Sequence, residues 1–465
     1  MAEENQTGIG GAELKTTLKN IGLLVTMDRN YRELEEAYIQ IEDGIIKDIG
    51  TGKPPAGEIE IDLKDHLVTP GFVNTHHHFY QSLFRSVKEV ASAKLFEWLV
   101  FLYEKWKNLD NEAIFVSSKI AIYEMMASGV TTTTDMLYLH PSGREYFIDS
   151  EISAAIDTGI RFHPTRGSMS LSRKDGGLPP DSVVQTERKI VEDSVRLIEK
   201  YHDSRKHSML RIALAPCSPF SVTEESMIRT AELAEEFDVL LHTHLAETRD
   251  EDDFCINRKK LRPVEYMEKI GWLNRRTWFA HLVWLNDEDI EKLAANDCGM
   301  AHCPTSNMRL GSGIAPVKEM KEAGIRIGLA VDGSSSNDSG NMLLEIRNAL
   351  MLQRVTKGAD ALSPRDVLEF ATIGGAKVLR MDDYIGSIEP GKSADLAAFS
   401  LNKLSMAGGL SDPVASLVLC DMHGSDLVMI NGKIRVQNGR VIDNDLPELI
   451  RRQNEISKKM IAGNS

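Results

Sequence analysis

Eight short apolar runs recur through the middle of this chain, and segments with helical spacing separate most of them. Each run is apolar on both faces, which is typical of parallel strands buried between layers. Regular alternation of strand and helix predicts a (β/α)8 TIM barrel, an α/β fold. The runs are residues 68–74, 130–135, 161–165, 211–217, 239–247, 277–283, 299–306 and 326–332.

The two chain ends have a different pattern. Both contain short alternating runs and the Asx-Gly pairs Asp43–Gly44, Asn431–Gly432 and Asn438–Gly439, which favour tight β-hairpins. We therefore expect a small β-sandwich domain built from both ends, with residues 1–67 as its N-terminal part and 386–465 as its C-terminal part. The latter includes a charged helix after Asp445, and residues 68–385 are expected to form the barrel.

Charge and cysteine content restrict the partners. The chain has 54 Lys and Arg against 69 Asp and Glu, a net charge of −15, so neither nucleic acid nor an anionic membrane is an expected partner. Its five cysteines are odd in number and form no C-x-x-C pair, which favours a reducing compartment. Residues 1–11 lack the apolar core of a signal peptide, and no run approaches 18 apolar residues. A soluble cytoplasmic protein is expected.

Metal-binding residue types follow several of the predicted strands. His76, His77 and His78 end the first run, and alternate residues of a strand share a face, so His76 and His78 point the same way. A single histidine cluster can also be a polar turn. Further candidates end the fifth, sixth and eighth runs, at His242, His244, His281 and Asp332. Because strand ends meet in one pocket of a barrel, three imidazoles, one carboxylate and an open position suit Zn²⁺ or Fe²⁺.

Four motifs carry a resemblance to a known family. PGFVNTHHH, HTHLAE, FAHLVWL and AVDGSSSND are similar to the amidohydrolase superfamily, specifically its cytosine/guanine/triazine deaminase branch. GSIEPGKSADLAAF near the C-terminal end is similar to that family's return to its small β domain. The resemblance implies that the metal ligands are His76, His78, His244 and Asp332, and that the catalytic residues are Glu247, His281 and Asp332. His77 and His242 are then packed or hydrogen-bonded histidines.

A missing lysine sets the expected metal number. Binuclear relatives carry a carboxylated Lys at the end of strand four, where this chain has Ala215–Pro216–Cys217. The resemblance therefore implies one divalent ion, Zn²⁺ with Fe²⁺ as the alternative, which would lower the pKa of a water. Asp332 and His281 would orient that water and accept its proton, and Glu247 would carry a proton to a ring nitrogen before ammonia leaves. The other zinc deaminase fold is excluded because it requires P-C-x-x-C.

Finer similarities concern the substrate. NTHHHFYQSLFRSV, APCSPFSV and RGSMSLSRKDGGLPPDSVV resemble branch members that deaminate 8-oxoguanine, which implies conversion of 8-oxoguanine to urate and ammonia. Deamination of isoxanthopterin or another pterin, and hydrolysis of an s-triazine, are alternatives on the same scaffold. A non-catalytic scaffold protein is a remote alternative, since every ligand and the glutamate are present. The family commonly forms homo-oligomers, so one is expected here.

Residues at or after strand ends are candidates for contacting the substrate. They are Gln81, Trp106, Arg166, Cys217 and His302. Each also has a structural alternative. Gln81 can be a loop amide, Trp106 an aromatic packed on the barrel, and Arg166 part of a salt bridge. Cys217 can be a core thiol or a metal ligand, and His302 a core histidine. Trp98 and Tyr103 are further stacking candidates. Loop 168–181, rich in Gly, Pro and Ser, is either an active-site lid or a surface insertion.

Overall fold

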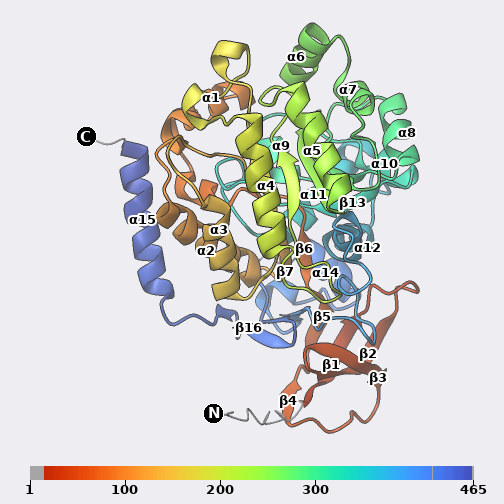
Figure 1. Cartoon of the computed structure of the whole chain (residues 1–465). Helices are drawn as coiled ribbons and strands as arrows, with labels where there is room; N and C mark the ends of the chain where they lie inside the picture. Colours follow the sequence, from red (N-terminus) through yellow and green to blue (C-terminus); the bar gives the residue numbers. More distant parts are fainter. Residues whose placement is uncertain (1–14, 421–422, 463–465) are drawn as a thin grey trace, which may run out of the picture.

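The computed structural model describes residues 15–420 and 423–462, so the polar start of the chain lies outside the described residues. Eight parallel strands form one sheet in sequential order, and each overlaps one of the eight predicted runs. The predicted barrel is therefore confirmed (Figure 1). Its strands are β6 (Phe72–Asn74), β7 (Val130–Leu137), β8 (Arg161–Ser168), β9 (Ala213–Pro216), β10 (Leu240–Leu245), β11 (Thr277–His281), β12 (Gly299–His302) and β13 (Arg326–Leu329).

The first and last strands meet through the segments that continue them. The backbone N–H of Thr75 donates to the carbonyl of Leu329 at 3.0 Å, and that of Asp332 donates to the carbonyl of His76 at 3.2 Å. These bonds bring the residues after β6 beside those after β13. The histidines of the first strand therefore face the aspartate of the eighth.

Helices surround the barrel, and capping residues mark where several begin. The Thr223 hydroxyl accepts from Ser226 N at the start of one helix, and Asn286 forms a capping box with Asp289 at another. The helices in and around the barrel are α1 (Leu95–Trp106), α2 (Asn111–Ala127), α3 (Phe147–Thr158), α4 (Glu187–Tyr201), α5 (Glu224–Glu236), α6 (Arg249–Lys259), α7 (Pro263–Lys269), α8 (Asp287–Ala295), α9 (Pro304–Arg309), α10 (Val317–Glu322), α11 (Met342–Lys357), α12 (Pro364–Glu369) and α13 (Gly375–Val378).

Strands from both chain ends form a separate nine-stranded sheet with its own apolar core. The three Asx-Gly pairs are its hairpin turns; in Asp43–Gly44, for example, both residues have positive φ, 51° and 77°. N- and C-terminal halves join where β5 pairs antiparallel with β14. The strands are β1 (Lys15–Val25), β2 (Glu33–Glu42), β3 (Ile45–Thr51), β4 (Ile59–Asp62), β5 (His66–Pro70), β14 (Leu396–Ser400), β15 (Leu427–Ile430), β16 (Lys433–Gln437) and β17 (Arg440–Val441).

The run predicted as one barrel strand, residues 68–74, is divided between the two sheets. Residues 68–70 pair with β14 in the chain-end sheet, and the barrel strand starts at Phe72. Gly71 lies at the crossing, where a Cβ atom would lie only 2.1 Å from the Thr131 side chain. Only glycine allows so close an approach, so the sharp passage between the sheets depends on this residue.

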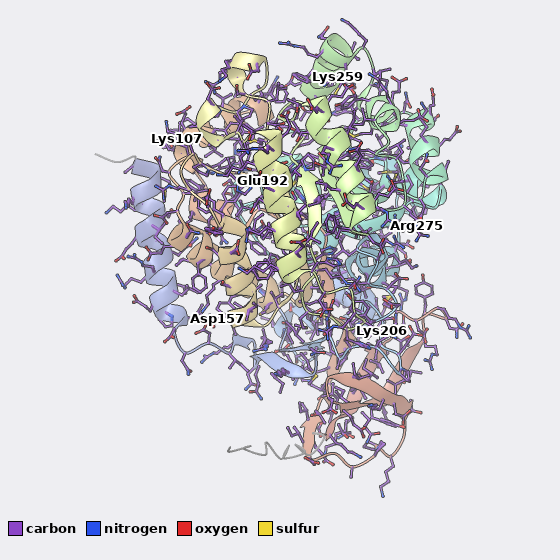
Figure 2. All side chains as sticks on the ribbon, viewed as in Figure 1. Lys107, Asp157, Glu192, Lys206, Lys259 and Arg275 are labelled. Atoms are coloured by element: carbon purple, nitrogen blue, oxygen red, sulfur yellow. The ribbon has the colours of Figure 1, made fainter. Side chains whose placement is uncertain are left out.

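The last helix, α15 (Leu446–Ala462), does not lie on the chain-end sheet. It packs along α2 and the turn after β6, on the flank of the barrel (Figure 1). α14 (Pro413–Leu419) packs against α11 and α12. Figure 2 shows charged side chains such as Lys107 and Arg275 toward the periphery of the molecule. Within the described ranges, no helix combines the length and apolar character that crossing a bilayer requires.

Candidate active site

Four histidines and an aspartate converge at the carboxyl ends of the barrel strands. His78 Nε2 lies 3.1 Å from His244 Nε2, and Asp332 Oδ1 lies 3.3 Å from His76 Nε2 and 3.5 Å from His78 Nε2. His281 belongs to the same cluster, with donor atoms that lie within 4.8 Å of those of His76 and His244. The structure thus brings together the residues that the sequence placed at four strand ends.

The hydrogen bonds of the Nδ1 atoms orient three of these imidazoles. The carbonyls of Met136 and Cys217 accept from Nδ1 of His78 and His244, at 2.8 and 2.7 Å. The side-chain oxygen of Asn307 accepts from His281 Nδ1 at 3.0 Å. Because a carbonyl oxygen can only accept, each Nδ1 carries a proton, and Nε2 is the ring nitrogen left to face the centre.

His76 is oriented by a second histidine. Nδ1 of His242 donates to the Trp278 carbonyl at 2.9 Å, so Nε2 of the buried, neutral His242 accepts from His76 Nδ1 at 2.7 Å. This leaves a lone pair on His76 Nε2, which is buried and has no hydrogen-bond partner. His242 therefore acts on the centre through His76. His77 points the other way, where its Nδ1 accepts from the backbone N–H of His78.

This donor set fits one divalent ion. Two nitrogens at 2.0–2.1 Å from a tetrahedral zinc are about 3.3 Å apart, close to the separations observed here. Lone pairs that face one another around an anionic oxygen repel unless a cation lies between them. A bound cation would also account for His76 Nε2, which is buried without a hydrogen-bond partner.

Glu247 lies beside the centre but belongs to no donor group. Its Oε2 is 3.6 Å from His281 Nε2, and the Ser312 hydroxyl donates to Oε1 at 3.4 Å. Burial raises the pKa of this carboxyl, which is only 4% exposed. Glu251, one turn further, accepts from the backbone N–H groups of Ala246 and Glu247, both at 3.0 Å. The turn after β10 is thereby held in place.

Strained backbone marks the strand ends that carry the cluster. Ala246, His281, Leu282 and Asp332 have φ values of 52°, 76°, 47° and 59°. Non-glycine residues in this region cost about 1–3 kcal/mol each and cluster at active sites. The strain allows the chain to turn sharply after β10, β11 and β13 while it keeps the polar side chains inward.

A small cavity opens beside the cluster. Its walls include His78, His244, His281, Asp332 and Glu247, together with the predicted contacts Gln81 and Cys217. Burial raises the pKa of the Cys217 thiol to about 12, so it is a neutral wall group. The free volume is about 30 Å³, far below the roughly 300 Å³ of the smallest drug-sized pockets. Leu95, Trp98 and Leu99 of α1 close it.

Three predicted substrate contacts lie elsewhere. Arg166 faces outward from β8, where its guanidinium bonds Asp193 on α4 and Gln185. Trp106 packs behind Trp98, with ring centroids 5.4 Å apart, and His302 is buried outside the cavity wall. None of loop 168–181 lines the cavity, and the backbone N–H groups of Ser170 and Leu171 donate to the Ser221 carbonyl.

Sequence reasoning missed several residues of the site. Tyr138 lines the cavity, Asn307 orients His281, and Cys303 belongs to a possible donor group with His281 and Asp332. Tyr138 follows the second predicted strand, so its position was a usable signal. The role of Asn307 depends on a contact between separate elements and has no sequence motif.

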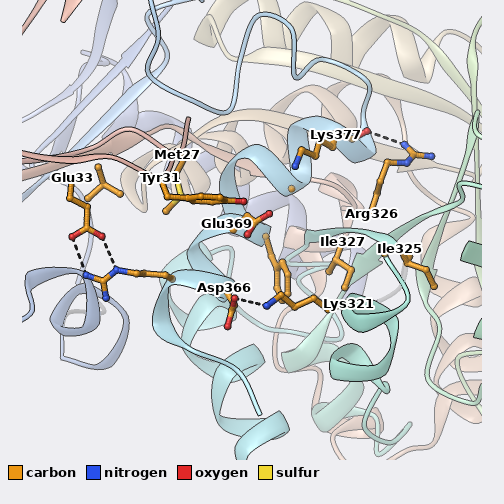
Figure 3. A pocket seen from close by; sticks show the side chains of 15 residues that line it. Met27, Tyr31, Glu33, Lys321, Ile325, Arg326, Ile327, Asp366, Glu369 and Lys377 are labelled. Atoms are coloured by element: carbon orange, nitrogen blue, oxygen red, sulfur yellow. Dashed lines mark hydrogen bonds and ion pairs between the residues drawn. The ribbon is translucent and has the colours of Figure 1, made fainter. Parts of the chain in front are cut away.

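A second cavity, of about 590 Å³, lies at the opposite end of the barrel, between β13, α12 and the turn joining β1 to β2 (Figure 3). None of its lining residues is His or Cys. Its wall charges are largely paired with one another: Arg365 bonds Glu33 at 2.7 Å, and Lys321 bonds Asp366 at 2.6 Å. Unlike the first cavity, this one therefore offers no imidazole or thiol ligand.

Comparison with known proteins assigns the family. The model of the amidohydrolase family matches residues 67–435, so the chain belongs to that family. It is 48% identical to 8-oxoguanine deaminase from Pseudomonas aeruginosa, over 91% of this chain and 94% of that protein. It is 32% identical to isoxanthopterin deaminase from an unknown prokaryotic organism, over 88% and 89%. The crystal structure of a zinc-complexed atrazine chlorohydrolase from Arthrobacter aurescens TC1 superposes with a TM-score of 0.90, at 30% identity and 95% and 100% coverage.

Proposed function

We propose that this chain is a hydrolytic deaminase that converts 8-oxoguanine and water to urate and ammonia. The observation that carries the proposal is the 48% identity, over nearly the whole chain, to 8-oxoguanine deaminase. The donor cluster, with a buried glutamate 3.6 Å from one of its histidines, supplies the chemistry that such a reaction needs. The expected cytoplasmic location and homo-oligomeric assembly stay predictions.

One divalent ion, Zn²⁺ with Fe²⁺ as the alternative, would be held by His76, His78, His244 and Asp332. When bound, it would lower the pKa of a water toward neutrality. A zinc-complexed structural relative supports the choice of zinc. The proposed number of one rests on the end of β9, which lacks the lysine of binuclear relatives.

The proton steps belong to the protein. Asp332 and His281 flank the water and orient it for attack on the ring carbon that bears the amino group. One proton of the water passes through Glu247 to the adjacent ring nitrogen. The second, which Asp332 and His281 accept from the hydroxyl added to the ring carbon, protonates the amino group, which leaves as ammonia as the carbonyl forms. The burial of Glu247 favours its part in this exchange because a carboxyl with a raised pKa holds a proton closer to neutral pH.

Substrate recognition is assigned to the cavity wall. The Gln81 amide would read the edge of the ring, and its Oε1 is buried with no partner. Trp98 and Tyr138 would contact the ring faces, and Cys217 would limit the size of the ligand. Because the present cavity is too small for a two-ring heterocycle, the part of α1 that carries Leu95, Trp98 and Leu99 must move to admit it.

Ammonia release from metal-replete protein tests the proposal. The panel is 8-oxoguanine, guanine, isoxanthopterin and an aminated triazine. We expect 8-oxoguanine to lead in kcat/KM by at least tenfold, or about 1.4 kcal/mol of discrimination. His76→Ala should lower the metal content, and full occupancy in that variant would contradict the ligand assignment. A metal-free wild-type protein would instead support the scaffold alternative.

A second candidate is a pterin deaminase or triazine hydrolase. It is favoured by the isoxanthopterin deaminase relative and by the structural similarity to atrazine chlorohydrolase. If the pterin or the triazine has the highest kcat/KM in the same panel, this second candidate replaces the first. The proposed proton steps are then unchanged.

A further inference from the structure

The C-terminal helix α15 is far from the metal centre in sequence, yet it packs against the turn that follows the first metal-site histidines. This turn, η1 (Phe79–Phe84), is a 3₁₀ helix directly after His78. The face of α15 that contacts α2 and η1 buries Gln453, Ile456 and Met460. Figure 1 shows the helix alongside α2, on the opposite side of the molecule from β1–β4.

η1 carries Gln81, which is 1% exposed and lines the cavity. The turn has few bonds of its own at this position. Gln81 N donates to the His78 carbonyl at 3.0 Å, and the Ser335 hydroxyl donates to the Gln81 carbonyl at 3.1 Å. Short 3₁₀ helices have poor internal hydrogen-bond geometry, so their position depends on outside contacts.

α15 supplies two such contacts to the residues immediately after Gln81. Gln453 Nε2 donates to the Ser82 hydroxyl at 3.1 Å, and both side chains are buried. The Ser457 hydroxyl donates to the Leu83 carbonyl at 2.6 Å. The Ser82 hydroxyl in turn donates to the Ser117 carbonyl of α2 at 3.1 Å, so the turn is fixed between the two helices.

We propose that α15 is a positioning element of the substrate pocket. Gln453 and Ser457 hold η1 so that the Gln81 amide faces the heterocycle, and the C-terminal helix thereby sets substrate affinity without touching the substrate. The inference rests on the proposed function, because it takes Gln81 to contact the ring. It adds a determinant of affinity that lies 371 residues beyond Ser82 in the chain.

Gln453→Leu tests this positioning with little change in volume. Loss of one buried hydrogen bond should raise KM for 8-oxoguanine by about threefold to tenfold, with kcat within about twofold of wild type. The matched control is Arg452→Ala, the neighbouring residue, whose ion pair joins α15 to Glu112 of α2 and leaves η1 untouched. KM of the control should equal that of wild type.

A double-mutant cycle separates positioning from a general loss of stability. Gln81→Ala should raise KM by itself, and adding Gln453→Leu should then raise it no further, because the residue being positioned is already absent. Additive effects, or a lowered Tm with unchanged KM in Gln453→Leu, would overturn the inference alone. A wild-type protein that releases no ammonia from any compound of the panel would overturn the inference and the proposed function together.

Discussion

Replacing His242 with phenylalanine should weaken metal binding although His242 presents no donor atom to the centre. In the folded protein its Nε2 accepts from His76 Nδ1 at 2.7 Å, and its ring stacks on Trp278 with centroids 4.3 Å apart. Phenylalanine keeps the stacking but cannot accept. His76 then either leaves a buried Nδ1–H unpaired or moves that proton to Nε2, where it occupies the lone pair that a metal needs.

The magnitude follows from the lost partner. An unsatisfied buried donor costs about 1–3 kcal/mol, and this cost falls on the metal-bound state because the metal-free state can change tautomer. The dissociation constant of the metal should therefore be about five- to 150-fold higher in His242→Phe than in the wild type. The range agrees with the roughly 10–100-fold cost of losing a partner that orients a metal-bound histidine.

Competition with a chromophoric zinc chelator measures this constant directly, and elemental analysis gives metal per subunit. His163→Phe is the matched control: it makes the same change in a buried histidine whose ring lies 6.2 Å from that of Trp278 but bonds no ligand. An unchanged constant in His242→Phe, or an equal loss in both variants, would refute the assignment of the His76 tautomer.

Further predictions address the proton steps, the pocket and the stability. Glu247→Gln should retain metal and lower kcat by at least about 100-fold in ammonia-release assays, because only the proton carrier is lost. Gly333→Ala would place a Cβ atom 2.0 Å from Gln81 Oε1, so KM should rise at unchanged metal content. Burial raises the pKa of Asp135 to about 8 and that of its partner Glu151 well above its usual range. The folded protein thus holds protons that the unfolded chain releases near pH 4. The free energy of unfolding should therefore fall as pH rises from about 4 through 8. Denaturant titrations at several pH values should show a shallower fall for Glu151→Gln than for the wild type.

Much of the architecture could be predicted because its signals are local. Apolar runs at regular intervals identified the eight strands, and Asx-Gly pairs identified three turns, since both depend on residues close in sequence. The donor cluster was predictable for a related reason. All parallel barrel strands end at the same face, so residues after four different strands had to meet once the barrel was recognised.

Substrate contacts were harder to predict because a strand's inward and outward positions alternate. Arg166 lies near the end of β8, and its side chain faces α4 and pairs with Asp193. Trp106 and Trp98 lie on one helix, yet only Trp98 reaches the cavity and Trp106 packs behind it. Spacing along the chain does not fix which of these faces turns toward the site.

The sequence by itself determined the strand order, the family and the donors at the strand ends, because periodicity, turn chemistry and motifs are properties of neighbouring residues. Only the tertiary structure decided which nitrogen of each histidine faces the centre, how closely α1 closes the cavity, and where α15 lies. These features depend on contacts between residues such as His76 and His242, or Ser82 and Gln453, that are brought together only when the barrel closes.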